Sequence, residues 1–275
     1  QKLAMPGIKY QDMDKVNAAL EPFIKEIEVE TCGIEVEDTT AGYQTIGGRN
    51  IVACQGNTIC QKGNIDCTGL AQRMEKHLYP NPYHLKMVIA GCPNDCAKAN
   101  MADFGILGIA KIHFNAERCI GCGACVKACS HHAVDCLAIK HGKAVKEESK
   151  CIGCGECVLA CPTLAWQRDP KQLYMVKLGG RTSKKTPRTG KLFLNWVTEE
   201  VLHAVIKNLF EFEAEMLDGK PIYLHMGHLI DRAGYHKFKE RVLRGVTLNP
   251  EAMVADRIFW AEDQYVANMH VKAVQ

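Results

Sequence analysis

Hydrophobic residues recur at helical spacing in four parts of the chain. Leu70, Met74 and Leu78 share one face of a predicted helix over residues 68–77. A longer apolar stripe follows Thr198, a residue that favours the capping position, and ends at Gly219, which predicts a second helix. Helical spacing also predicts a helix near the amino end that Pro22 should bend or interrupt, and another over residues 235–244.

Strand-like runs lie between these helices. Residues 84–90, 104–114 and 172–178 are rich in aliphatic and β-branched side chains, and glycines lie within or beside them. Residues 221–226 predict a further strand, and shorter strand-like segments lie in the first forty residues. Strands and helices are mixed, and the fold class is predicted to be α+β.

The composition narrows the class of protein. The chain has 275 residues, of which 47% are hydrophobic and 24% charged, as in ordinary globular proteins. A formal net charge of +3 gives no reason to expect nucleic acid or an anionic membrane as a partner. No apolar run reaches the roughly 18 residues of a membrane helix. No Gly-x-Gly-x-x-Gly opens a helix after a strand, which argues against a dinucleotide bound by that fold.

Cysteine dominates the candidate chemistry. There are 15 cysteines, and 12 of them fall into three spaced sets of four. The remaining three are Cys32, Cys67 and Cys136, which are expected to be simple buried thiols, with Cys136 of interest because it lies within one of the sets. An odd number of cysteines at metal spacing favours clusters in a reducing compartment, the cytoplasm, over a disulfide framework.

The first set consists of two pairs from separate turns. Cys54 and Cys60 are followed, after 31 residues, by Cys92 and Cys96. Four thiolates suit one iron–sulfur cube, and two separate turns leave one face of that cube open to a second large group. The alternatives are buried hydrophobic cysteines or disulfides, but the Pro-Asn-Asp between Cys92 and Cys96 is typical of a loop.

The second and third sets form an internal repeat in which Cys-Ile-Gly-Cys-Gly opens each half. The spacing is that of bacterial two-cluster ferredoxins, in which the fourth cysteine of each run ligates the other cube. Zinc is the alternative for such pairs, whereas His131 and His132 are expected to be solvated. One cube is assigned to Cys119, Cys122, Cys125 and Cys161, and the other to Cys129, Cys151, Cys154 and Cys157.

The first set, within Gly-Cys-Pro-Asn-Asp-Cys, resembles the sirohaem and iron–sulfur motif of the sulfite and nitrite reductases, and most closely that of the anaerobic sulfite reductases. The resemblance implies one sirohaem and three [4Fe-4S] clusters, with Cys96 bridging the sirohaem iron and its cube. It implies a mixed-sheet sirohaem domain over residues 44–113 and 164–275, with a two-cluster ferredoxin domain inserted at 114–163. Residues 1–43 resemble the remnant of a half-domain, the rest of which is expected to lie upstream.

The resemblance also suggests the residues that hold the substrate. Arg49 matches a substrate-binding arginine, and His84 and Lys86 match two lysines of the family, with histidine as a departure that can still donate a proton. Arg49 could serve its own haem or that of a neighbouring chain, or could be a surface arginine, and His84 could be a solvated strand-end residue. A basic loop is expected either to meet sirohaem carboxylates or to be solvated; its cations are Arg181, Lys184, Lys185 and Arg188.

These observations predict the catalytic subunit of a sirohaem-dependent sulfite reductase, which reduces sulfite to sulfide with six electrons relayed through the cubes. The resemblance implies a flavin- and NAD(P)H-binding subunit and a further iron–sulfur subunit as donors, and the chain could form a homo-oligomer. Two alternatives remain: a sirohaem nitrite reductase, and an electron carrier without haem.

Overall fold

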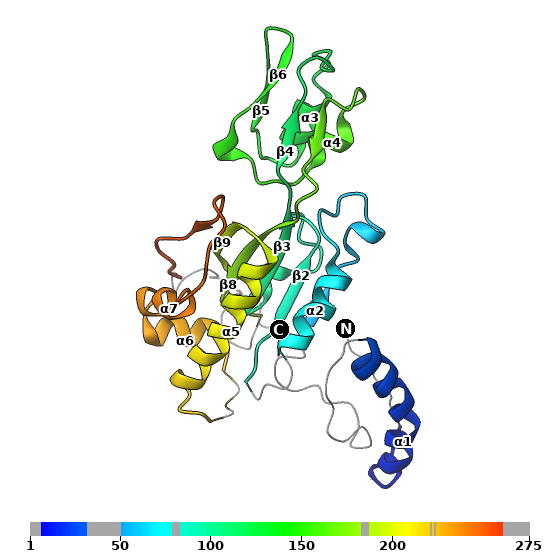
Figure 1. The fold of residues 1–275 in the computed structure, drawn as a ribbon, viewed down its shortest axis with the longest axis vertical. Coiled ribbons are helices and arrows are strands. Elements are labelled where there is room, and N and C mark those ends of the chain that lie inside the picture. Colours follow the sequence, from blue (N-terminus) through cyan, green and yellow to red (C-terminus); the bar gives the residue numbers. More distant parts are fainter. Residues whose placement is uncertain are drawn as a thin grey trace, which may run out of the picture.

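A six-stranded mixed sheet forms the larger lobe of the computed structural model, which describes residues 7–31, 51–78, 83–182, 187–220, 222 and 224–260 (Figure 1). The strand order is β1-β2-β3-β8-β9-β10. The bounds are β1 Ile51–Ala53, β2 Met87–Ala90, β3 Phe104–Ile109, β8 Leu173–Leu178, β9 Lys191–Val197 and β10 Met253–Val254.

Three neighbouring strands of this sheet run parallel, and the others are antiparallel. β1 pairs with β2, and β2 with β3, in parallel register. β8 then runs antiparallel to β3, and β9 and β10 continue antiparallel. Every residue of β2 and β3 is buried, because both faces of the parallel part are covered. The carboxyl ends of β1, β2 and β3 therefore meet at one edge of the sheet.

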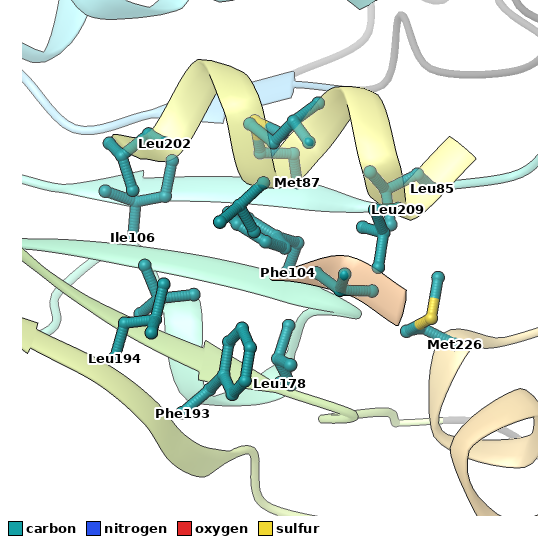
Figure 2. Close-up of a cluster of buried hydrophobic side chains, with 14 of the residues drawn as sticks. Leu85, Met87, Phe104, Ile106, Leu178, Phe193, Leu194, Leu202, Leu209 and Met226 are labelled. Atoms are coloured by element: carbon teal, nitrogen blue, oxygen red, sulfur yellow. The ribbon is translucent and has the colours of Figure 1, made fainter. Parts of the chain in front are cut away.

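Two helices, α2 (Cys67–Leu78) and α5 (Glu199–Met216), cover one face of the sheet. Alternate residues of β2 and β3 point into this core, where Met87, Phe104 and Ile106 pack against Leu202 and Leu209 of α5 (Figure 2). Both helices were predicted from the spacing of their apolar residues, and their stripes are buried as expected. α6 (Met226–Ala233) and α7 (Tyr235–Val242) extend the core beside α5.

The loop that connects β2 to β3 packs on the other face. Val88 and Leu107 point to this side and pack against Ala99 and Ala102 of the loop, which includes a short 3-10 helix at Ala99–Met101. Alanines and Gly105 allow this segment to lie directly on the strands, because a Cβ on Gly105 would collide with the carbonyl oxygen of Ala99. The chain thus returns from the cysteine edge of the sheet to the opposite edge.

A smaller lobe is inserted between β3 and β8. Its stalk is the antiparallel pair β4 (Ile112–Phe114) and β7 (Trp166–Arg168), and the predicted boundaries at 114 and 163 fall beside these strands. The lobe has its own core around Trp166, Leu137 and several cysteines. It holds α3 Ala124–His131, α4 Glu156–Ala160 and the hairpin β5 Leu137–Lys140 with β6 Lys143–Lys146.

Two local predictions need correction. The described residues of the 221–226 segment do not form the expected strand: Ile222, Leu224 and His225 have no regular structure, and α6 begins at Met226. The predicted interruption at Pro22 is absent within α1 (Met13–Ile24), and the helix changes to π-helical geometry at Lys25–Thr31, which begins three residues after the proline. No helix among the described residues is both long and apolar enough to cross a bilayer.

Candidate iron–sulfur and cation sites

The first cysteine set lies where β1 and β2 end. Cys54 directly follows β1 and Cys92 follows β2 after one glycine, so the parallel register brings both to the same edge of the sheet. The backbone N–H of Cys54 donates to the carbonyl oxygen of Ile89 at 2.8 Å, which ties the first turn to the strand that carries the second. We call Cys54, Cys60, Cys92 and Cys96 the sheet-edge set.

Tight turns place the other two members of this set. The Cys60 N–H donates to the Gly56 carbonyl at 2.9 Å, and Gly56 has φ +64°, where a Cβ would lie 2.6 Å from the carbonyl oxygen of Ile65. Asp95 adopts φ +52°, and its carboxylate accepts backbone N–H groups of Ala99 and Asn100 at 2.6 and 3.0 Å. These bonds hold the turn that leaves Cys96 exposed.

The thiols of the sheet-edge set are close enough to affect each other's ionisation. Burial raises the pKa of Cys92, and negative charge on Cys96, Cys60 and Cys54 raises it further. Four thiols that interact in this way, on two turns held by backbone hydrogen bonds, have the donor chemistry for one iron–sulfur cube. All described cysteines are free of disulfides.

In the smaller lobe, Cys129, Cys151, Cys154 and Cys157 line one hollow with apolar walls that include Ile112 and Leu137. We call these four the inner set. Burial raises the pKa of Cys154, and raises that of Cys157 to about 12. The hollow brings the fourth cysteine of the first repeat to the first three of the second, which is the exchange that two-cluster ferredoxin spacing requires.

The outer set consists of Cys119, Cys122, Cys125 and Cys161. Burial raises the pKa of Cys125, to which negative charge on Cys161 also contributes. Lys143 of β6 donates to the carbonyl oxygens of Ala116 and Cys119 at 2.8 and 2.7 Å, so the distal hairpin holds the loop on which Cys122 is exposed.

The inner set adjoins the turn that carries Cys60. The side-chain amide of Asn64 donates to the carbonyl oxygens of Gly108, in β3, and Gly153, between two inner-set cysteines, at 3.2 and 3.1 Å. The Asn64 N–H donates to Gly91, next to Cys92, at 2.7 Å. Lys62 forms an ion pair with Glu156 at 2.8 Å, and this pairing raises the pKa of Lys62.

His84 and Lys86 lie at the other end of β2 from Cys92. Both precede the strand, whereas Cys92 follows it, and the six residues of extended chain from Lys86 to Cys92 span roughly 20 Å.

The buried carboxylate of Asp103 contacts backbone N–H groups and histidine side chains at this end of β2. It accepts N–H groups of Lys86 at 3.3 Å and Met226 at 3.0 Å, contacts His225 Nδ1 at 3.0 Å, and lies 4.0 Å from His84 Nε2.

Two arginines of the predicted basic loop lie at this same end, beyond β8. Arg181 and Arg188 exchange backbone hydrogen bonds at 2.9 Å; Arg181 contacts His228 Nε2 at 2.9 Å, and Arg188 pairs with Asp231 at 2.6 Å. Burial and the charge of Arg188 lower the pKa of Arg181, which is 8% exposed. Two neighbouring guanidinium groups, one buried and one partly buried, suit an anionic group. Arg49, Lys184, Lys185 and Cys32 lie outside the described residues.

A second buried carboxyl group lies near Asp103. Glu213, on α5, is 1% exposed, and burial together with the charge of Asp103 raises its pKa to about 9. The folded chain therefore keeps a proton that the unfolded chain releases above about pH 4.5, so stability declines as pH rises from there to about 9, by about 1.4 kcal/mol per pH unit.

We expect Glu213→Gln to raise the free energy of unfolding at pH 7 by up to about 3 kcal/mol and to leave it nearly unchanged at pH 4. Urea unfolding at both pH values measures this. Glu211→Gln, on the exposed side of the same helix, is the matched control and should stay within about 0.5 kcal/mol. An equal gain at both pH values would contradict a raised pKa at Glu213.

Asn64, Asp103 and His225 were not predicted from the sequence. None belongs to a spaced motif, and their side chains make contacts with residues up to 123 positions away in the chain. The only local signal was the Asp that directly precedes the 104–109 strand, and a lone Asp before a strand is uninformative.

The three cysteine sets, at the edge of a mixed sheet and in a lobe beside it, define a protein built for iron–sulfur clusters. Residues 46–248 match the family model described as the nitrite and sulphite reductase 4Fe-4S domain. The chain belongs to this family. Because the match covers most of the chain, it also confirms that this chain has the predicted α+β fold class of these reductases.

Curated relatives carry more specific names. The chain is 77% identical over 272 residues to a subunit of the anaerobic sulfite reductase of Salmonella typhimurium, covering 99% of this chain and 81% of the relative. It is 34% identical over 198 residues to the coenzyme F420-dependent sulfite reductase of Methanocaldococcus jannaschii, covering 70% of this chain and 30% of the relative. The structure of dissimilatory sulfite reductase I shares the fold, with a TM-score of 0.56 and 20% identity over 78% of this chain and 57% of that one.

Proposed function

We propose that this chain is the catalytic subunit of a sirohaem-dependent sulfite reductase. The observation that carries the proposal is the arrangement of three thiol sets, which begins with the outer set in the smaller lobe and ends at the exposed Cys96 of the sheet-edge set. The name of the Salmonella typhimurium relative, which is identical at 77% of aligned positions, supports the substrate. A bound sirohaem would supply the redox iron at which an anion is reduced.

The residues fit this cofactor in two respects. Cys96 is exposed beside three less exposed thiols, so its sulfur can be shared between a cube and a second metal. Asn94 Nδ2 donates to Cys96 Sγ at 3.1 Å, which orients that sulfur. We propose that Cys96 is the shared ligand and that the sheet-edge, inner and outer sets hold one [4Fe-4S] cluster each.

The cationic residues require a different arrangement. His84, Lys86, Arg181 and Arg188 lie at the opposite end of the strands from Cys92. Since β2 and its flanking residues separate them by roughly 20 Å, we propose that the cations of one chain face the cysteine edge of a second copy. At that edge the cations would bind sulfite and haem carboxylates, and His84 would supply protons. Arg49, Lys184 and Lys185 lie outside the described residues and stay predicted ligands of the same anions.

The contacts in the smaller lobe suggest the order of electron transfer. The outer set receives electrons on the exposed side of Cys122, and the inner set passes them to the sheet-edge set across Asn64, Gly153 and the Lys62–Glu156 pair. We propose partner subunits as donors, a flavin- and NAD(P)H-binding one and an iron–sulfur one, and a cytoplasmic location where free thiols persist.

The junction between the two lobes gives a testable prediction. Asn64→Ala removes the donor to Gly108 and Gly153, so two carbonyl groups lose their partner, which costs about 1–3 kcal/mol. We expect slower transfer from the inner to the sheet-edge cube, measured as the rate at which sulfite reoxidises the prereduced cubes. Asn57→Ala, in an exposed position of the same turn, should react at the wild-type rate. Equal rates in all three proteins would contradict a path through this junction.

Turnover tests the substrate. With a reduced viologen as donor, the protein should reduce sulfite to sulfide with a higher kcat/KM than it reduces nitrite to ammonia. A preference for nitrite would favour the nitrite reductase alternative. If protein that contains all its cubes reduces neither sulfite nor nitrite, the electron-carrier alternative is favoured.

A further inference from the structure

Two histidines and one aspartate from three separate segments meet at the end of the sheet opposite Cys92. His84 lies just before β2, Asp103 directly precedes β3, and His225 directly precedes α6. His225 Nδ1 lies 3.0 and 3.1 Å from the two carboxylate oxygens of Asp103, and His84 Nε2 lies 4.0 Å from Oδ2. One possible ligand atom from each residue lies within 4.8 Å of the other two.

These separations suit a single metal ion. Nitrogen and oxygen ligands bind Zn²⁺ at about 2.0–2.2 Å, so neighbouring ligand atoms of a tetrahedral site lie about 3.3–3.6 Å apart. The contacts of Asp103 with the two histidines lie on either side of this range, and small side-chain movements would therefore complete the site. Two imidazoles and one carboxylate form a ligand set that leaves the fourth position to water.

The carboxylate of Asp103 is already held in one orientation. It is completely buried, and it accepts the backbone N–H groups of Lys86 and Met226 at 3.3 and 3.0 Å. Hydrogen bonds of this kind fix the direction of a metal-binding carboxylate. A buried carboxylate also requires positive charge beside it, which a divalent cation supplies. The side chains of the two histidines are 13% and 18% exposed, so the cluster is not sealed from solvent.

We infer that His84, Asp103 and His225 form a site for one Zn²⁺ ion. Imidazole and carboxylate also accept Fe²⁺, but a given set of such ligands binds zinc more tightly in the usual order of divalent metals. None of the three residues is a cysteine, so the site is separate from the clusters and does not depend on the proposed function. The ion would join the segments that precede β2, β3 and α6.

The ion would act on two arginines through α6. This helix carries His228 and Asp231, which contact Arg181 and Arg188 at 2.9 and 2.6 Å. The site would fix the start of α6 to the sheet and so keep both contacts in place.

Zinc ligation and proton donation exclude each other at His84, because zinc binds the neutral imidazole and displaces its proton. Zinc is therefore expected to slow sulfite reduction by the wild-type chain. This consequence alone rests on the proposed function, which assigns proton supply to His84.

The test is zinc binding by the whole chain, purified without oxygen and with its cubes intact, so that iron occupies the ligand cysteines. We expect one zinc per chain, and X-ray absorption at the zinc edge should show only nitrogen and oxygen neighbours at about 2.0–2.2 Å. Competition with a chelator of known affinity measures the strength of binding. His84→Ala and His225→Ala should each weaken it about 100-fold or more.

His113→Ala is the matched control and should bind zinc as tightly as the wild-type chain. His113 also contacts an aspartate, since its Nε2 lies 2.7 Å from Asp169, but this pair belongs to no group of three possible ligands among the described residues.

Three results would overturn the inference. A wild-type chain that binds no zinc would mean that His225 and Asp103 form an ion pair only. Sulfur neighbours at about 2.3 Å would place the zinc on cysteines. Equal affinity in the wild-type chain and in either folded histidine variant would exclude that histidine as a ligand. Zinc that binds with the expected neighbours without slowing sulfite reduction would support the site and contradict the proton supply proposed for His84.

Discussion

Cys96→Ser is expected to abolish sulfite reduction, with a decrease of about 100-fold or more. The substitution removes the thiolate proposed to link the haem iron to the sheet-edge cube. Cys96 is exposed and lies outside the hydrophobic core, so the chain should still fold. We expect loss of the haem absorption bands and of about five irons, with the two cubes of the smaller lobe retained. Absorption, iron content and turnover measure these three effects.

Cys122→Ser provides the matched control, since Cys122 is also exposed and also belongs to a ligand set. This variant should lose about four irons and keep the haem bands. Haem retained at full occupancy in Cys96→Ser would contradict the proposed bridging ligand.

Cys122→Ser also carries the second large expected effect. If electrons enter through the outer cube, reduction of sulfite by a protein donor should fall by about 100-fold. Reduction by a small viologen that reaches the haem directly should stay close to the wild-type rate. Comparing the rates with the two donors isolates the step at which electrons enter the protein, because both assays end in the same reduction of sulfite.

The backbone of the same loop supplies a test for general damage. Gly123→Ala changes a residue with φ +76° and open space around it. Gly123→Ala should lower donor-driven and viologen-driven rates alike, if at all. Similar rates with a protein donor in Cys122→Ser and in the wild-type chain would contradict entry through the outer cube.

Much of the cluster architecture could be predicted from the sequence, because cysteine spacing reports directly on ligand geometry. The exchange of Cys129 and Cys161 between the two repeats was predicted from spacing, and the structure places Cys129 with Cys151, Cys154 and Cys157 around one hollow. The helices over Cys67–Leu78 and Glu199–Met216 were predicted because their buried stripes are long.

Other features depend on tertiary contacts that leave no local pattern. The 221–226 segment has the composition of a strand, yet it leads into α6, whose first residue donates its N–H to Asp103, 123 positions away. The family resemblance also placed His84 and Lys86 in one site with Cys96, because they match two lysines of the family. The direction of β2 separates them, and only the sheet shows this.

The most direct test of the proposed sirohaem site is an absorption spectrum with an iron count on protein purified without oxygen, from cells able to make sirohaem. We expect sirohaem bands together with about thirteen irons per chain, twelve in three cubes and one in the haem. Iron–sulfur absorption with about twelve irons and no haem band would contradict a sirohaem reductase. In that case Cys96 would be an ordinary cube ligand and the chain an electron carrier.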